Sequence, residues 1–287
     1  MPQSKNKQKM AIKNHVRSIS FPSRSHPSTL AIEEGLNELS AMEISTSSSR
    51  SICASLSGLE ELYKCTDDLL NMGSTQRVLS ERRKFLEELL DGSLRLMDIC
   101  SVSRDLMVET GENVRALQSG VRRRRGGNDH GVVSSYVGFR KNMRKQARKL
   151  LVSLKQIENI AGRVITDEED DHLVAVVHVM RRVVSVSASI LNSFLEFLSG
   201  SKKNKWSLVV MKMLQKDGEE TDKIKKREEN ELESLDSVVS RGEYSREVLG
   251  KKLEELEISV GGFEKNLENL FRRLIRTRAS LLNVTSQ

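Results

Sequence analysis

An apolar seam near the C-terminus constrains the fold of this chain more than any other feature. Apolar side chains recur there at alternating spacings of four and three residues, at Leu249, Leu253, Leu256, Val260, Phe263, Leu267, Leu270 and Leu274. On an α-helix this spacing gathers the side chains on one face, which is the pattern of a helix that packs along other helices. Similar seams recur through most of the chain. The sequence therefore predicts an all-α fold, a bundle of long antiparallel amphipathic helices.

Composition agrees with long helices. Charged residues make up 30% of the 287 residues and aromatic residues only 4%, a balance that favours amphipathic helices over sheets. The three prolines all precede residue 28, so glycines and polar clusters must end the later helices. We expect helices near residues 29–44, 52–73, 76–119 (kinked or split near Gly92 or Arg104), 136–162, 173–198, 206–214 and 245–283.

Two basic segments lie outside the predicted helices. Residues 1–27 carry Lys and Arg but no Asp or Glu, which predicts a disordered, Ser-rich basic arm. An organellar transit peptide, and so plastid targeting, is the alternative interpretation of this arm. Arg17 stands three residues before Ser20, a spacing that suits basophilic kinases and makes Ser20 a candidate phosphorylation site. Residues 28–287 are expected to form one helical domain, with a flexible, glycine-rich basic linker at about 119–134.

The most apolar stretch, residues 173–198, is predicted to be the central core helix, closed by Gly200. Its uncharged part runs only from residue 183 to 195, shorter than the roughly 20 residues that span a bilayer. The charged stretch 219–236 has a thin apolar stripe and is predicted to form an edge helix or a protruding one. The acidic run 167–171 is interpreted as capping the central helix, with Thr166 and Glu169 forming a capping box.

No constellation with catalytic, cofactor-binding or metal-ligating spacing is found. His172 and His178 stand six residues apart and so face different sides of a helix. The three cysteines, Cys53, Cys65 and Cys100, lack the pairing of a zinc site and the density of a secreted disulfide scaffold, which favours a reducing compartment. We therefore expect no enzyme activity, no cofactor and no bound metal.

One electrostatic feature exceeds background. Ten cations fall between residues 122 and 149 against the single acid Asp129: Arg122, Arg123, Arg124, Arg125, Arg140, Lys141, Arg144, Lys145, Arg148 and Lys149. The last six recur at helical spacing opposite a seam that runs from Tyr136 to Ile157. Such a basic amphipathic helix binds anionic lipid, an acidic partner or nucleic acid. An internal alternative stays open, in which this face pairs with the acidic stretches 167–171 and 219–236.

Four blocks of sequence resemble a plant-specific family grouped with the BYPASS-type proteins. These blocks are residues 15–27 with the following Ile32-Glu33-Glu34, and residues 88–98, 122–126 and 270–283. The resemblance implies a plant protein made of one long helical domain, without known enzyme activity, that acts in root and shoot development. It supplies no catalytic residues.

Together these observations predict a non-enzymatic adaptor or regulatory protein that acts through protein contacts and an anionic membrane surface. The expected location is the cytoplasm, with peripheral membrane attachment. A nucleic-acid-associated regulator is the alternative and an enzyme of unknown type a weaker one; nucleic acid ranks lower because no stacking aromatics accompany the cations. The protein partner is not identified by the sequence. If one seam is not covered by the other helices, the C-terminal helix is the candidate to form a homodimer.

Overall fold

The computed structural model describes residues 27–43, 48–123, 130–161, 171–200, 229–241 and 245–286. Every regular element in these ranges is an α-helix, which confirms the predicted all-α fold. The helices are α1 (Pro27–Glu43), α2 (Ser49–Leu70), α3 (Gly73–Glu81), α4 (Arg83–Arg123), α5 (His130–Ala161), α6 (Asp171–Ser199), α8 (Glu231–Arg241) and α9 (Arg246–Thr285).

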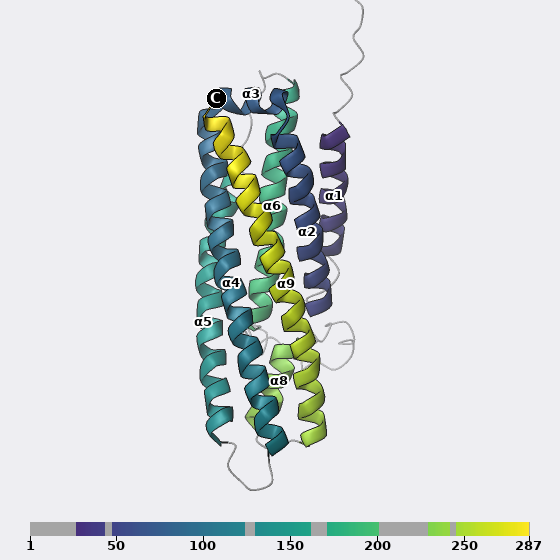
Figure 1. Cartoon of the computed structure of the whole chain (residues 1–287), viewed down its shortest axis with the longest axis vertical. Helices are drawn as coiled ribbons and strands as arrows, with labels where there is room; N and C mark the ends of the chain where they lie inside the picture. The colour runs from purple at the N-terminus through teal and green to yellow at the C-terminus, as the bar shows by residue number, and fades with distance from the viewer. Residues whose placement is uncertain are drawn as a thin grey trace, which may run out of the picture.

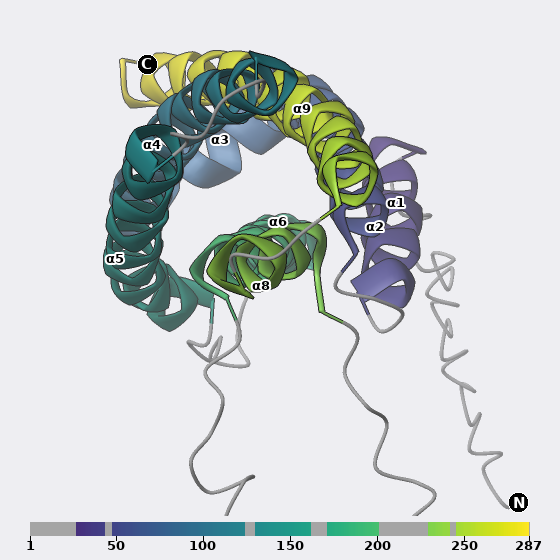
Figure 2. The same ribbon diagram turned by 90° about the horizontal axis from the view of Figure 1, so that it is seen from below.

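The long helices form an arc around a central one. Seen along the bundle, α5, α4, α9, α2 and α1 follow one another around α6, with α8 in line with α6, and one side of the arc stays open (Figure 2). The short α3 crosses one end of the bundle (Figure 1). The most extensive packing joins α4 to α9, α5 to α6 and α2 to α9. This arrangement leaves α5 and α1 as the two edges of the arc.

Most neighbouring helices run antiparallel, as predicted, but α2 and α9 run in the same direction. Cys53 O accepts from Asn266 Nδ2 at 3.0 Å, and the Asp67 carboxylate further along α2 accepts from Thr277 further along α9. The order of these contacts shows a parallel pair. The antiparallel arrangement does not extend to this pair, because seam spacing is the same for both helix directions.

The C-terminal seam lies inside the protein. All eight of its apolar residues are at most 4% exposed, and α9 packs against both α4 and α2. The C-terminal seam is therefore part of the protein's own core. A homodimer through this helix remains a prediction, and it would have to use the outward face of α9 rather than the seam.

The predicted helix at 76–119 breaks at a different place. The break falls at Arg82, whose backbone (φ −108°, ψ 53°) separates α3 from α4, and α4 then continues unbroken through Gly92 and Arg104 to Arg123. Helix also covers residues 119–123 and 130–134 of the predicted linker. The two helices therefore extend into both ends of the predicted linker, because glycine and arginine are tolerated in the end turns of packed helices.

The central position of α6 is as predicted. Nearly all of its apolar side chains are buried, and it ends at Gly200, whose φ of +72° is the left-handed conformation that glycine adopts most easily. By length and composition alone, the stretch Val174–Ser199 could cross a membrane: it has a mean hydropathy of 1.6, and 61% of its apolar 18-residue window is buried in the bundle. Core helices of soluble proteins have the same properties, so this is weak evidence for a span.

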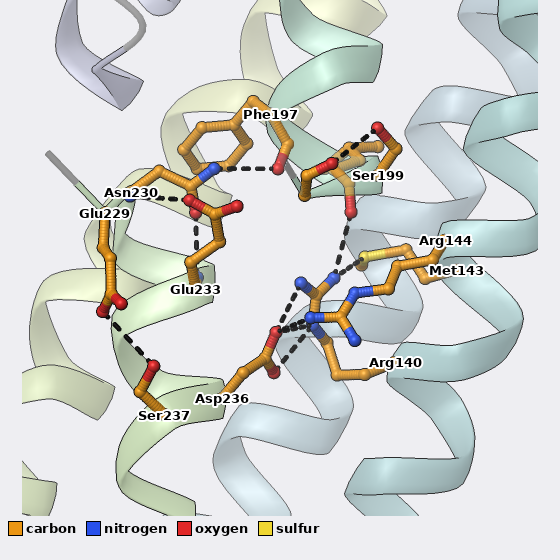
Figure 3. A network of polar contacts seen from close by, with 12 residues as sticks. Arg140, Met143, Arg144, Phe197, Ser199, Glu229, Asn230, Glu233, Asp236 and Ser237 are labelled. Atoms are coloured by element: carbon orange, nitrogen blue, oxygen red, sulfur yellow. Dashed lines mark hydrogen bonds and ion pairs between the residues drawn. The ribbon is translucent and has the colours of Figure 1, made fainter. Parts of the chain in front are cut away.

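The helix α8 continues the line of α6. Asn230 joins the two: its Nδ2 donates to Phe197 O at 3.1 Å, and its Oδ1 accepts from Glu233 N at 2.9 Å (Figure 3). Glu233 in return accepts from Asn230 N at 3.3 Å, which completes a capping box. Leu232, Leu235 and Val239 are buried, so this part of the predicted edge helix lies within the bundle. Burial on neighbouring helices compensates for the thin stripe.

Several predicted features lie outside the described residues. They are most of the basic arm including Ser20, the capping box at Thr166 and Glu169, the helix at 206–214, and Arg124 and Arg125 of the linker.

Candidate anionic-surface site on α5

The helix α5 forms one edge of the arc and has two chemically different sides. Its seam, which includes Tyr136, Met143, Ala147, Leu154 and Ile157, is buried against the neighbouring helices. On the opposite side Lys141, Lys145, Arg148 and Lys149 are all exposed. This division follows from the helical period, since residues three and four apart share a side. The predicted separation of seam and cations is therefore present for these four residues.

These four cations have no internal counter-ion in the part of the chain that the structure describes. Lys141, Lys145, Arg148 and Lys149 make no ion pair there, and residues 131–157 contain no Asp or Glu. Cations that are exposed and not neutralised locally attract anionic surfaces over a range set by the Debye length, about 8–10 Å at physiological salt.

Arg140 was predicted on this exposed face, and that placement was wrong. Its side chain is only 2% exposed, and its guanidinium binds the carboxylate of Asp236 on α8 through Nε at 3.0 Å and Nη2 at 2.8 Å (Figure 3). Nη1 donates to Met143 Sδ at 2.7 Å and to Leu198 O at 3.3 Å. Arg140 lies four residues after Tyr136 and three before Met143, so it belongs to the seam by spacing.

Asp236 is the common acceptor of a small network. Arg144, which is 37% exposed, donates to Asp236 Oδ2 at 2.6 Å, and the Tyr136 hydroxyl donates to Oδ1 at 3.0 Å. Burial and the nearby Asp236 carboxylate raise the pKa of Tyr136 above its ordinary range. The internal alternative is thus observed for Arg140 and Arg144, paired with one acid of the stretch 219–236. Sequence could not identify this acid, because Arg140 and Asp236 are 96 residues apart in the chain and only the tertiary structure brings them together.

Of the remaining predicted cations, Arg122 and Arg123 are described, and they lie at one end of α4. Arg122 and Arg123 are exposed in its last turn, where Arg123 Nη2 donates to Ser119 Oγ at 2.6 Å. A cation in the last turn of a helix is favoured by the helix dipole. These two residues are therefore available to an anionic surface, but they lie at the end of the bundle rather than along its side.

Negative charge flanks the α5 face on both sides. On α4, Asp98, Asp105, Glu109 and Glu112 are exposed, and the nearby Arg95 reaches Gln156 of α5 at 2.6 Å. Across the open side of the arc, α1 carries Glu33, Glu34 and Glu38 and has no Lys or Arg (Figure 2). The exposed cations of α5 therefore lie between two sets of carboxylates, one on α4 and one on α1.

The sequence patterns do not predict a cavity of about 680 Å³ where the N-terminal ends of α2 and α8 meet α9. Ser49 donates to the Glu231 carboxylate there and contacts Ser259 Oγ at 3.0 Å. The other carboxylate oxygen of Glu231, Oε2, is buried without a hydrogen bond among the described residues. No local sequence pattern predicts this cavity, because its lining residues come from three separate helices.

The described residues hold no group of three or more His, Cys, Asp and Glu that could bind a metal ion. Burial raises the pKa of the Cys53 thiol to about 11 and that of Cys100 to about 12, so both stay protonated at neutral pH. A protonated thiol is a poor nucleophile. Of the histidines, His178 is exposed on α6, and the side chains of the others lie outside the described set.

A model of the family described as Protein BPS1 matches residues 55–284. The match runs from α2 to α9 and so covers the bundle apart from α1 and the start of α2. It agrees with the resemblance to BYPASS-type proteins that the sequence blocks indicated. Searches of curated proteins and of solved structures give no match.

Proposed function

The chain belongs to the BPS1 family, and on this premise we propose that it is a non-enzymatic adaptor or regulator of plant root and shoot development that attaches to anionic membrane surfaces. The family suggests a role in plant development. The observation that carries the attachment is the exposed face of α5, where four cations have no ion pair within the described residues.

The size of the charge suits reversible attachment. A Lys or Arg near an anionic leaflet contributes about 1 kcal/mol, so four cations supply several kcal/mol before the entropy of binding is subtracted. That is enough for salt-sensitive association and too little for permanent insertion. Protein contacts would then be made by the other faces of the bundle.

Nucleic acid is the less favoured ligand for this face. Single strands are held by aromatic side chains that stack on bases, and the two aromatic residues of α5, Tyr136 and Phe139, are both buried. Duplex binding by phosphate contacts alone stays open to test.

The test is flotation of the full chain with phosphatidylcholine vesicles that contain or lack phosphatidylserine. The variant changes Lys141, Lys145, Arg148 and Lys149 to Glu; Arg140 and Arg144 stay unchanged because they bind Asp236. The control changes the exposed Arg77, Lys84, Lys251 and Lys265 to Glu. These residues lie on α3, α4 and α9, and the control changes the net charge of the protein by the same amount as the α5 variant.

We expect the wild type and the control to bind only the anionic vesicles, with the α5 variant and high salt abolishing the binding. Equal loss in both variants would show that net charge rather than α5 acts. No binding by the wild type would remove the membrane proposal. Salt-sensitive binding of duplex DNA or RNA in its place would favour the nucleic-acid alternative.

A further inference from the structure

The cations of α5 are spread along the helix rather than gathered at one end. From Lys141 to Lys155, which is also exposed, the helix axis advances about 21 Å. Two exposed apolar residues share this side: Val137 is 51% exposed and Val152 is 64% exposed. Residues 137, 141, 148, 152 and 155 follow spacings of four, seven, four and three, which keep them on one strip of the helix. The strip is thus long and basic, and it includes two small apolar side chains.

Contact through the outward side of α5 brings this strip to a flat anionic surface without also presenting the carboxylates of α1 or α4. If the open side of the arc faced the surface, α1 with Glu33, Glu34 and Glu38 would approach it together with α5 (Figure 2). If the surface met the outer side of α4, Asp98, Asp105, Glu109 and Glu112 would face it. If the bundle stood on end, Arg122 and Arg123 would touch and most of α5 would not (Figure 1).

We propose that the chain lies on its α5 edge, with the bundle axis parallel to an anionic bilayer and with Val137 and Val152 reaching the headgroup region. This inference rests on the proposed membrane attachment and adds the orientation. In that orientation α1 lies on the far edge of the arc, where salt screens its carboxylates from the surface. The cations along α5 then act together, whereas the cations at the end of α4 contribute little.

Paired substitutions along the molecule test the orientation. Full-length variants carry K141E/K145E near the first half of α5, K149E/K155E near its second half, R122E/R123E at the end of α4, or E34Q/E38Q on α1. All of these side chains are exposed, and none of them pairs with Asp236. Circular dichroism checks each fold. Binding is titrated with vesicles of phosphatidylcholine and phosphatidylserine at fixed salt.

We expect each α5 pair to weaken binding at least tenfold, by similar factors, since each cation near the surface is worth about fivefold in affinity. The α4 pair should cost less than threefold, and the α1 pair should change affinity less than twofold. A dominant effect of R122E/R123E with little effect of K149E/K155E would establish an upright bundle instead. A tenfold gain from E34Q/E38Q would place the open side down.

The two proposals fail in different ways. If the wild-type chain does not bind anionic vesicles, the attachment itself is wrong. If it binds but the variants show the result expected for an upright bundle or for the open side facing down, attachment stands and the proposed orientation is wrong. Replacing Val137 and Val152 with Ser, which adds no charge, gives an independent test: a loss of binding supports contact with the headgroups, and an unchanged affinity argues against it.

Discussion

At the scale of single residues, Arg140 shows how one position decides between surface and core. Its neighbours Lys141 and Lys145 face solvent, whereas Arg140 is buried with its guanidinium on Asp236. A buried ion pair is costly to desolvate, and it becomes strongly destabilising when one partner is removed. The ion pair joins α5 to α8, so its loss should destabilise the packing of these two helices.

We predict that Asp236→Asn lowers the free energy of unfolding by about 3–5 kcal/mol, because it leaves the Arg140 charge buried without its carboxylate. Urea denaturation followed by circular dichroism measures this. The double variant Arg140→Met with Asp236→Leu should recover most of the loss, since no charge remains buried. A double variant as unstable as the single one would show that the packing, rather than the charge, was at fault.

Adjacent glycines on α9 offer a second residue-scale prediction. A Cβ on Gly261 would meet nothing within 4 Å, whereas a Cβ on Gly262 would lie 3.2 Å from Cys53 Sγ. Gly261→Ala should therefore stabilise the protein by up to about 1 kcal/mol through helix propensity. Gly262→Ala should gain less or destabilise. Adding Cys53→Ala to Gly262→Ala should move its thermal midpoint toward that of Gly261→Ala; no such shift would mean that Cys53 is not the obstacle.

At the scale of elements, α6 and α8 behave as one column made of two helices. Together they are about as long as α4 or α9, and Asn230 satisfies backbone groups of both. The end of one helix leaves carbonyl groups without partners and the start of the next leaves N–H groups, so one side chain that serves both joins them efficiently.

We predict that Asn230→Ala destabilises the protein by about 1–2 kcal/mol, the cost of losing an N-cap side chain. Asn230→Asp should cost less, because the carboxylate still accepts from Glu233 N while the donation to Phe197 O is lost. Guanidinium denaturation compares the two. If both variants were as stable as the wild type, the joint would be held by apolar packing alone.

Some elements could be predicted from the sequence and others could not. The seam of α9 and the apolar character of α6 were sufficient to place both in the core, since a continuous apolar face must be covered. The break at Arg82 and the inclusion of α8 in the core were not predictable. Neither has a strong local signal, and both depend on the space that neighbouring helices leave.

At the scale of the whole molecule, the two edges of the arc differ in charge. Basic side chains occupy the α5 edge, and acidic ones occupy α1 and the outer side of α4. No single segment carries this polarity, because it arises from the order in which the helices surround α6 (Figure 2).

The same architecture predicts that the connection between α6 and α8 can be shortened. Because Asn230 contacts Phe197, the chain leaves the central column at Gly200 and returns beside it at residue 229. We predict that replacing residues 201–228 with a short Gly-Ser bridge preserves helical content and cooperative unfolding, with the unfolding midpoint changed by only a few degrees. Circular dichroism melts measure this. A loss of cooperative unfolding would show that the deleted residues contribute to the core.

By itself the sequence determined the helical fold, the seams, the central helix and the presence of a basic face, because these depend on periodicity and on charge along one helix. Only the tertiary structure decided that Arg140 belongs to the core, that α2 and α9 run parallel, and which cations remain exposed. Those outcomes depend on partners far away in the chain. Helical periodicity specifies which side of a helix is covered, but the identity of the covering element is decided by packing in three dimensions.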